Sequence, residues 1–133
     1  MRKVEYLLLT FFLILGVFLR FYKINSPIAD WHSWRQADTA AVTRNYQKLG
    51  INILYPRYDD FSDVSGKGLF NPDGFRFVEF PIFNLIHLTL VNAFPGFSLE
   101  YLGRLTSIIA STTTSLFLWI IVRRYSGGLA GVL

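Results

Sequence analysis

The sequence predicts an all-α integral membrane protein, in which transmembrane helices flank an outer loop that carries membrane-parallel helices. Of the 133 residues, 52% are hydrophobic and only 17% are charged, which is too apolar for an ordinary soluble domain of this length. The apolar residues are also clustered, because residues 6–19 and 105–122 contain no charged side chain. Each stretch approaches the roughly 20 residues that a helix needs to cross a bilayer core.

The placement of charge supports the same fold class. Residues 23–102 are about neutral, so the net charge of +4 comes from basic residues at the edges of the two apolar stretches. Such a distribution orients a protein in a membrane and gives no support for a nucleic-acid partner. Membrane lipids are the expected surroundings, and we expect a multi-pass protein of the plasma or inner membrane.

The first element is a transmembrane helix over residues 1–22. Its apolar core is short unless the Arg20 guanidinium reaches the lipid headgroups, which would extend the span to about Tyr22. A cleaved signal peptide would also begin with basic residues, here Arg2 and Lys3, before an apolar run. However, Arg20 and Lys23 stand where a signal peptide would carry small residues for cleavage, which favours a retained helix.

Residues 23–102 are expected to form an outer loop on the periplasmic or extracellular side. Arg2 and Lys3 precede the first apolar stretch, whereas Arg123 and Arg124 follow the last. Positive side chains prefer the cytoplasmic flank of a span. Two crossings therefore place both basic pairs in the cytoplasm and the loop between them outside.

A first amphipathic helix is predicted in this loop over about residues 34–49. Ser33 and Gln36 have the spacing of a capping box, and Gly50 stands where a helix often ends on a glycine. One face of this helix carries Thr39, Val42, Tyr46 and Leu49. That face would allow the helix to lie on the membrane surface.

A second amphipathic helix is predicted over residues 81–97, where it would lie along the outer leaflet or dip into it. The alternative is a third membrane crossing, in which Pro95 and Gly96 would form the turn of a helical hairpin. Residues 59–74, between the two helices, are rich in Gly, Asp, Ser and Asn, which predicts a loop. Three carboxylates of this loop are expected to be solvated; they are Asp59, Asp60 and Asp63.

A second transmembrane helix is predicted over residues 103–122. Residues 123–133 would then form a cytoplasmic turn and the start of a further span, since the sequence becomes apolar again after Arg123 and Arg124. We therefore expect the chain to be the N-terminal portion of a larger multi-span bundle.

Asp30 is the first candidate for chemistry, because it lies just before the helix predicted at residues 34–49. The positive end of a helix dipole and its unpaired backbone N–H groups keep a carboxylate ionised. An ionised carboxylate near His32, Arg35 and Asp38 is suited to act as a general base toward a hydroxyl group. The simpler interpretation is that Asp30 caps the helix or forms a local salt bridge.

Three further charged residues are candidates for a site at the membrane surface. Arg35 and Arg44 could each hold a phosphate oxygen bidentately, or they could anchor the helix to lipid headgroups. Nine residues separate them, so they do not share a tight face of the helix. Glu79 stands between aromatic residues just before an apolar helix, and ionisable groups at membrane depth are costly and usually functional.

No metal site is predicted from residue spacing. The chain has no cysteine, and His32 and His87 stand alone in their segments without the spacing of zinc ligands. A core or interfacial position is the simpler interpretation of both histidines. A divalent metal stays open as a cofactor, and no other cofactor is indicated.

Several short segments together resemble a known family. They are DWHSWRQADTA from Asp30 to Ala40, Arg44-Asn45, Leu54-Tyr55-Pro56, Glu79-Phe80-Pro81 and Gly103-Arg104-Leu105. In their order and spacing they resemble the opening of the GT-C membrane glycosyltransferases, and most closely glycosyltransferase family 39. That family includes protein O-mannosyltransferases and bacterial aminoarabinose transferases of lipid A, and the resemblance covers nearly the whole chain.

The resemblance implies a GT-C bundle that moves a sugar from a polyprenyl-phosphate donor to a hydroxyl of a lipid, glycan or protein acceptor. The catalytic carboxylate would be Asp30 or Asp38, because this sequence has the single Asp30 where family members carry an Asp-Glu pair. Glu79 would occupy the place of the family's Glu-Lys-Pro element, although Phe80 replaces the lysine and no lysine contact carries over.

On this hypothesis the active site faces the outer side of the membrane. Arg35 and Arg44 would bind the donor phosphate, with His32 and Gln36 as supporting residues, and the 133-residue chain alone would be inactive. Two other classes of function fit the same pattern. One is a non-catalytic membrane subunit or lipid-binding module, and the other is a transporter fragment in which Asp30 and Glu79 bind a coupling ion or carry a proton.

Overall fold

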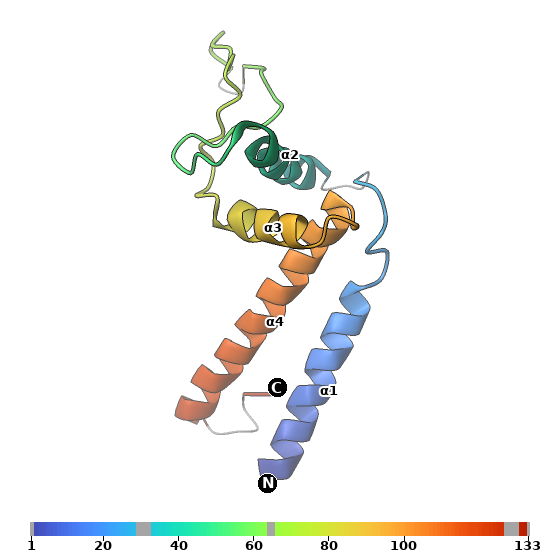
Figure 1. Cartoon of the computed structure of the whole chain (residues 1–133). Helices are drawn as coiled ribbons and strands as arrows, with labels where there is room; N and C mark the ends of the chain where they lie inside the picture. Colours follow the sequence, from blue (N-terminus) through green and yellow to red (C-terminus); the bar gives the residue numbers. More distant parts are fainter. Residues whose placement is uncertain (1, 29–32, 64–65, 127–130, 133) are drawn as a thin grey trace. The chain divides into compact units, whose positions relative to one another are not determined.

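The computed structural model describes residues 2–28, 33–63, 66–126 and 131–132. Within these ranges the chain forms four α-helices and no strand beyond one isolated β-bridge. The helices are α1 (Arg2–Arg20), α2 (Ser33–Leu49), α3 (Ile82–Ala93) and α4 (Leu99–Ser126) (Figure 1). The predicted all-α class is therefore observed, and each helix overlaps a segment where the sequence predicts one, although α4 begins before and ends after the predicted bounds 103–122.

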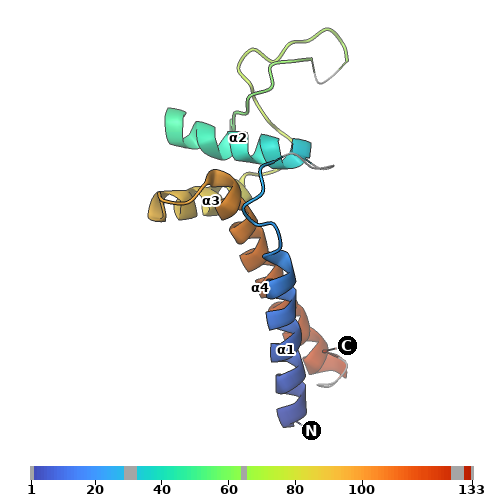
Figure 2. The same ribbon diagram turned by 90° about the vertical axis from the view of Figure 1, so that its right-hand side faces the viewer.

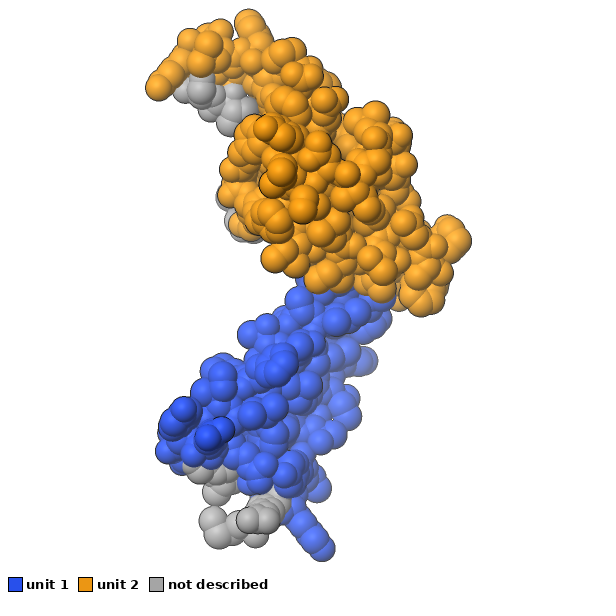
Figure 3. All heavy atoms as spheres, turned by 60° about the vertical axis from the view of Figure 1, so that its left-hand side comes forward, with its two compact units in different colours: residues 1–25, 104–133 blue, residues 26–103 orange. Residues whose placement is uncertain are grey.

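The chain divides into two compact units (Figure 3). Unit 1 comprises Met1–Asn25 and Arg104–Leu133, and unit 2 comprises Ser26–Gly103. Unit 2 thus contains most of the loop that the sequence assigns to the outer side of the membrane. The first residues of α4 belong to unit 2 and the remainder of this helix belongs to unit 1.

The core of unit 2 lies where α2 packs on α3 (Figures 1 and 2). The central residues of α2 are small, and Ala40 and Ala41 are buried at the contact. Small side chains allow two helices to approach closely, so that larger residues on either side can fill the remaining space. The buried cluster consists of Ala41, Val42, Tyr46, Tyr58 and Leu88.

This packing corrects the prediction that the apolar face of α2 lies on the membrane surface. Val42 and Tyr46, two of the residues assigned to that face, are buried inside unit 2. Helix α2 ends as its sequence predicts, because Gly50 adopts a φ of 89° and its N–H donates to the Tyr46 carbonyl at 3.1 Å. This is the αL termination that glycine makes without steric cost.

Helix α3 is shorter than the predicted segment 81–97, since it has 12 residues and ends at Ala93. Such a helix is about 18 Å long, whereas a hydrocarbon core is about 30 Å thick. The alternative of a third crossing therefore finds no support in its length. Asn84, His87 and Leu88 form its buried face, so α3 belongs to the core of unit 2.

The segment between α2 and α3 is a loop closed at its base by a short antiparallel contact. Arg57 and Phe75 form a β-bridge, and the Tyr58 N–H donates to the Gly74 carbonyl at 2.7 Å. Gly74 has a φ of 62°, and a Cβ added there would lie 2.5 Å from the Tyr58 carbonyl oxygen. Only glycine fits this close approach of the two backbones.

In unit 1, α1 and the later part of α4 run antiparallel (Figure 1), and side chains of α4 contact the start of α1 and the segment that follows its end. At one end, Arg123 Nε lies 2.8 Å from Glu5 Oε1 as an ion pair outside hydrogen-bond geometry. The same guanidinium donates to the Tyr6 hydroxyl at 2.8 Å and lies 5.0 Å from the ring centres of Tyr6 and Trp119. At the other end, Arg104 donates to the Ile24 carbonyl at 2.7 Å.

Among the described residues, α4 is the one helix that is long and apolar enough to cross a membrane by length and composition. Helix α1 is too rich in charge to qualify in the same way, because every 18-residue stretch within it contains three charged residues. It ends at Arg20, whose guanidinium folds back to donate to the Gly16 carbonyl at 3.1 Å. The predicted extension of this helix to Tyr22 is therefore not observed.

Candidate functional site

Four of the residues singled out from the sequence lie on or beside the N-terminal half of α2: Arg35, Gln36, Asp38 and Glu79. Asp30 and His32, together with Trp31, lie outside the described residues, and α2 begins at Ser33. Four charged residues of unit 2 form what we call the charged cluster: Arg35, Asp38, Arg76 and Glu79. Three of them were candidates from the sequence.

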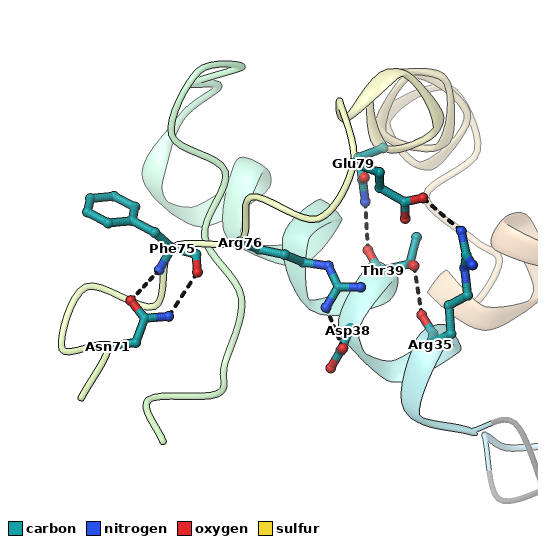
Figure 4. Close-up of polar contacts among 8 residues, drawn as sticks. Arg35, Asp38, Thr39, Asn71, Phe75, Arg76 and Glu79 are labelled. Atoms are coloured by element: carbon teal, nitrogen blue, oxygen red, sulfur yellow. Dashed lines mark hydrogen bonds and ion pairs between the residues drawn. The ribbon is translucent and has the colours of Figure 1, made fainter. Parts of the chain in front are cut away.

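Two ion pairs build the charged cluster (Figure 4). An Arg35 Nη2 atom donates to Glu79 Oε2 at 2.8 Å, and the Arg76 guanidinium donates to an Asp38 carboxylate oxygen. Arg35 and Asp38 are three residues apart on α2, which makes them neighbours on the helix surface. Positive and negative charges therefore alternate across the start of this helix.

The two pairs differ in exposure. The Arg35 side chain is 77% exposed, whereas that of Arg76 is only 12% exposed. Arg76 also lies 5.3 Å from the centre of the Tyr58 ring, which is part of the buried core. The guanidinium of Arg76 is thus held in place, and that of Arg35 is available to other partners.

Hydrogen bonds to backbone atoms fix the frame of the charged cluster. Asn71 donates to the Phe75 carbonyl at 2.8 Å and accepts from the Phe75 N–H at 3.0 Å, which sets the chain just before Arg76 (Figure 4). On α2, the Thr39 hydroxyl donates to the Arg35 carbonyl at 2.7 Å. Asn84 of α3 donates to the Thr39 carbonyl at 2.7 Å.

Behind this frame lies a buried polar network of Thr39, Thr43, Asn84 and His87. Asn84 donates to the Thr43 hydroxyl at 3.0 Å, and that hydroxyl lies 3.1 Å from His87 Nδ1. His87 Nε2 lies 2.9 Å from the Leu99 carbonyl, which can only accept, so Nε2 carries the proton. Burial lowers the pKa of His87 and keeps this ring neutral. His87 is therefore a core residue, as its sequence context favours.

Arg44 lies apart from the charged cluster. Its guanidinium donates to Asp59, and Asn45 donates to the other oxygen of the same carboxylate at 3.0 Å. The hydrogen bond from Arg44 is the main cause that lowers the pKa of Asp59. The Asp59 side chain is about half exposed, as predicted for a solvated loop carboxylate, but it also ties the loop to α2. This geometry gives no support to the prediction that Arg44 binds a phosphate.

The remaining predicted residues add little to the site. Gln36 is half-buried on α2. Within the described ranges no three His, Asp or Glu side chains come together as a metal site, and Asp30 and His32 lie outside those ranges.

Arg76 is the functional candidate that sequence reasoning missed. It stands between Phe75 and Phe77, so the criterion that selected Glu79, a charge placed among aromatic residues, would also have selected Arg76.

Comparison of the chain with family models, with curated proteins and with solved structures finds no match.

Proposed function

We propose that the chain belongs to an integral membrane glycosyltransferase of the GT-C type, similar to glycosyltransferase family 39. It would transfer a sugar from a polyprenyl-phosphate carrier to a hydroxyl acceptor at the outer face of the membrane. The observation that carries the proposal is the charged cluster, which places two carboxylates and two guanidinium groups at the start of α2, a few residues after Asp30.

The proposal includes two membrane crossings, by α1 and α4. It is supported by their antiparallel arrangement in unit 1, which puts Glu5 beside Arg123 and Arg104 beside Ile24. The ion pair of Glu5 and Arg123 would offset two charges that are costly near a bilayer. With both basic termini of these helices in the cytoplasm, unit 2 lies outside, where the sugar of a lipid-linked donor is also found.

Arg35 is the group that we assign to the donor phosphate. An exposed ion pair such as that of Arg35 and Glu79 contributes only about 0–1 kcal/mol. A phosphate can therefore displace Glu79 at small cost and gain charge-assisted, bidentate hydrogen bonds from the guanidinium. Arg76 is more buried and would position Asp38 instead of binding the donor.

In the proposed reaction, Asp30 accepts the proton of the acceptor hydroxyl. The hydroxyl oxygen forms a bond to the anomeric carbon while the bond from that carbon to the phosphate oxygen breaks, with inversion of configuration. The leaving phosphate takes the electron pair, and Arg35 stabilises its charge. Asp38 is the alternative base, and the acceptor is a lipid, a glycan or a protein.

Turnover of a polyprenyl-phosphate sugar by the full-length protein that would contain this chain, measured in native membranes at matched protein abundance, tests the proposal. Asp30→Asn keeps the side-chain volume but removes the proton acceptor, and should lower turnover by about 10²–10⁴-fold. Arg35→Ala should weaken use of the donor. Asp60→Asn is the matched control, because Asp60 is a loop carboxylate outside the charged cluster, and its Oδ1 accepts from the neighbouring Ser62 N–H.

The outcomes separate the assignments. Near-normal turnover in Asp30→Asn would remove Asp30 from the mechanism, and a larger loss in Asp38→Asn would make Asp38 the base. Absence of transfer by the unaltered protein with every polyprenyl-phosphate sugar tried would contradict the enzyme and favour a non-catalytic membrane protein.

A further inference from the structure

A cleft of about 580 Å³ opens in unit 2 beside the C-terminal half of α2. Its volume is in the range of small-molecule sites, which is about 300–1,000 Å³. Tyr55 and Phe75 supply aromatic surface, and Asn45, Asn52 and Arg57 supply polar groups. None of these residues belongs to the charged cluster.

Tyr55 provides an open aromatic platform. Its side chain is 52% exposed although the ring is held between neighbours, with centroid distances of 5.6 Å to Phe75 and 6.0 Å to Phe77. The guanidinium of Arg57 lies 5.1 Å from the centre of the Phe75 ring. A flat apolar surface therefore adjoins a planar hydrogen-bond donor.

Two asparagines line the cleft with oriented amide groups. Asn52 Oδ1 accepts from the backbone N–H groups of Leu54 at 3.2 Å and Tyr55 at 3.1 Å, and these bonds leave the Nδ2 hydrogens as donors. Asn45 Nδ2 donates to the Arg57 carbonyl at 3.2 Å and to Asp59, which leaves Oδ1 as an acceptor. The cleft thus offers fixed donors and a fixed acceptor beside an aromatic ring.

This combination fits a saccharide. A sugar ring has an apolar C–H face that can stack on Tyr55, and hydroxyl groups that both donate and accept hydrogen bonds. A phosphate fits less well, because Arg57 is the one cation of the lining and lies 3.7 Å from the Asp73 carboxylate. We propose that this cleft binds a neutral saccharide.

The inference concerns binding alone and stands whether or not the chain transfers sugar. Within the proposed transferase, the cleft would hold a glycan acceptor at a place distinct from the donor phosphate. Failure of transfer and failure of saccharide binding are thus separate results.

The test is a titration of the full chain in phospholipid nanodiscs, without glycoside detergents that would themselves enter the cleft. NMR signals of the Asn45 and Asn52 side-chain amides are followed while methyl α-mannoside, methyl β-glucoside or N-acetylglucosamine is added. We expect at least one of these sugars to shift both signals saturably, with a dissociation constant on the order of 1–10 mM.

Variants distinguish stacking on Tyr55 from general surface binding. Tyr55→Ala should weaken affinity about tenfold, whereas Tyr55→Phe, which keeps the ring, should stay within about twofold. Asn52→Asp keeps the oxygen that accepts from the backbone and loses the amide donors, so it should weaken binding about fivefold. Phe70→Ala is the matched control, since Phe70 is an exposed aromatic residue outside the cleft.

Three results would overturn the proposal. The first is no saturable shift with any of the sugars while the remaining spectrum is that of the folded chain. The second is a response of the two amides to inorganic phosphate but not to sugars. The third is an equal loss of affinity in Phe70→Ala and Tyr55→Ala.

Discussion

The two compact units of the chain are stabilised by different kinds of contact. Unit 2 has a buried cluster of apolar residues and a buried polar network between α2 and α3. In unit 1, α1 and α4 are joined at their ends by long side chains such as that of Arg123, while apolar residues along both helices are exposed. Phe18 is 72% exposed and Phe117 is 61% exposed.

This difference indicates which solvent each unit suits. In unit 2, α2 and α3 pair their buried polar groups and bury apolar residues against each other, as in the core of a domain in water, although large apolar residues such as Phe70 and Val78 are exposed elsewhere in this unit. Exposed apolar side chains in unit 1 would be costly in water and favourable in lipid. If α1 and α4 cross a membrane as proposed, substitutions of exposed apolar residues should have different effects in the two units.

The largest expected effect comes from placing a charge on an exposed apolar position of unit 1. In water, replacing an exposed residue changes stability by about 0.5 kcal/mol or less. In a bilayer, Phe117→Arg should disfavour insertion of α4 by about 3 kcal/mol, measured as the inserted fraction in microsomes. The matched substitution in unit 2, Phe70→Arg, should leave insertion unchanged, and equal effects of the two would remove the distinction between the units.

A glycine substitution tests the tight loop of unit 2. Gly74→Ala forces a non-glycine residue into a positive φ and against the Tyr58 carbonyl, and should destabilise unit 2 by about 2–3 kcal/mol. Gly68 also has a positive φ, of 75°, but no atom lies within 4 Å of a Cβ added there. Gly68→Ala should therefore destabilise unit 2 by only about 1 kcal/mol. Amide hydrogen exchange in α2 and α3 measures both, and equal protection in the two variants would contradict the close approach at Gly74.

A smaller effect should appear with pH, because burial lowers the pKa of His87. Below the usual pKa of about 6.5, the unfolded chain binds a proton that the folded chain still excludes, so stability falls as pH falls. Hydrogen exchange of α3 should therefore become faster between about pH 7.5 and pH 5.5 after correction for intrinsic rates. His87→Gln should flatten the pH dependence of exchange in α3. An unchanged pH dependence in that variant would show that another group causes it.

The smallest effect is expected at Asp59, whose pair with Arg44 is about half exposed. Asp59→Asn keeps an oxygen for Arg44 but loses the charge, and should weaken protection at the C-terminal end of α2 by less than about 1 kcal/mol. Asp60→Asn, at the neighbouring loop position, is the control and should leave α2 unchanged. A larger loss at Asp60 than at Asp59 would contradict the anchoring role of Asp59.

Local signals predicted the helices of this chain well. The end of α2 at Gly50 could be predicted because the cause is a single residue that adopts a positive φ without strain. The partner of the apolar face of α2 could not be predicted in the same way. Val42 and Tyr46 would suit a membrane surface or another helix equally, and only the fold shows that α3 covers them.

The charged cluster shows the same limit for the site. Asp38 and Glu79 were candidates from local sequence, but their partners are 38 and 44 residues away along the chain. Such pairing depends on how the loop before Arg76 closes, which no local pattern specifies. Likewise, the tie between Arg44 and the half-exposed Asp59 depends on the path of the loop, which no local pattern specifies.

The central proposal is that α1 and α4 cross the membrane, with residues 26–103 on its outer side. The chain has no native cysteine, so single cysteines at Ser62 of unit 2 and Ser126 at the end of α4 report on sidedness without background. In intact cells, a membrane-impermeant thiol reagent should label Ser62→Cys, and it should label Ser126→Cys only after the cells are permeabilised. Labelling of Ser126→Cys but not Ser62→Cys in intact cells would contradict the account.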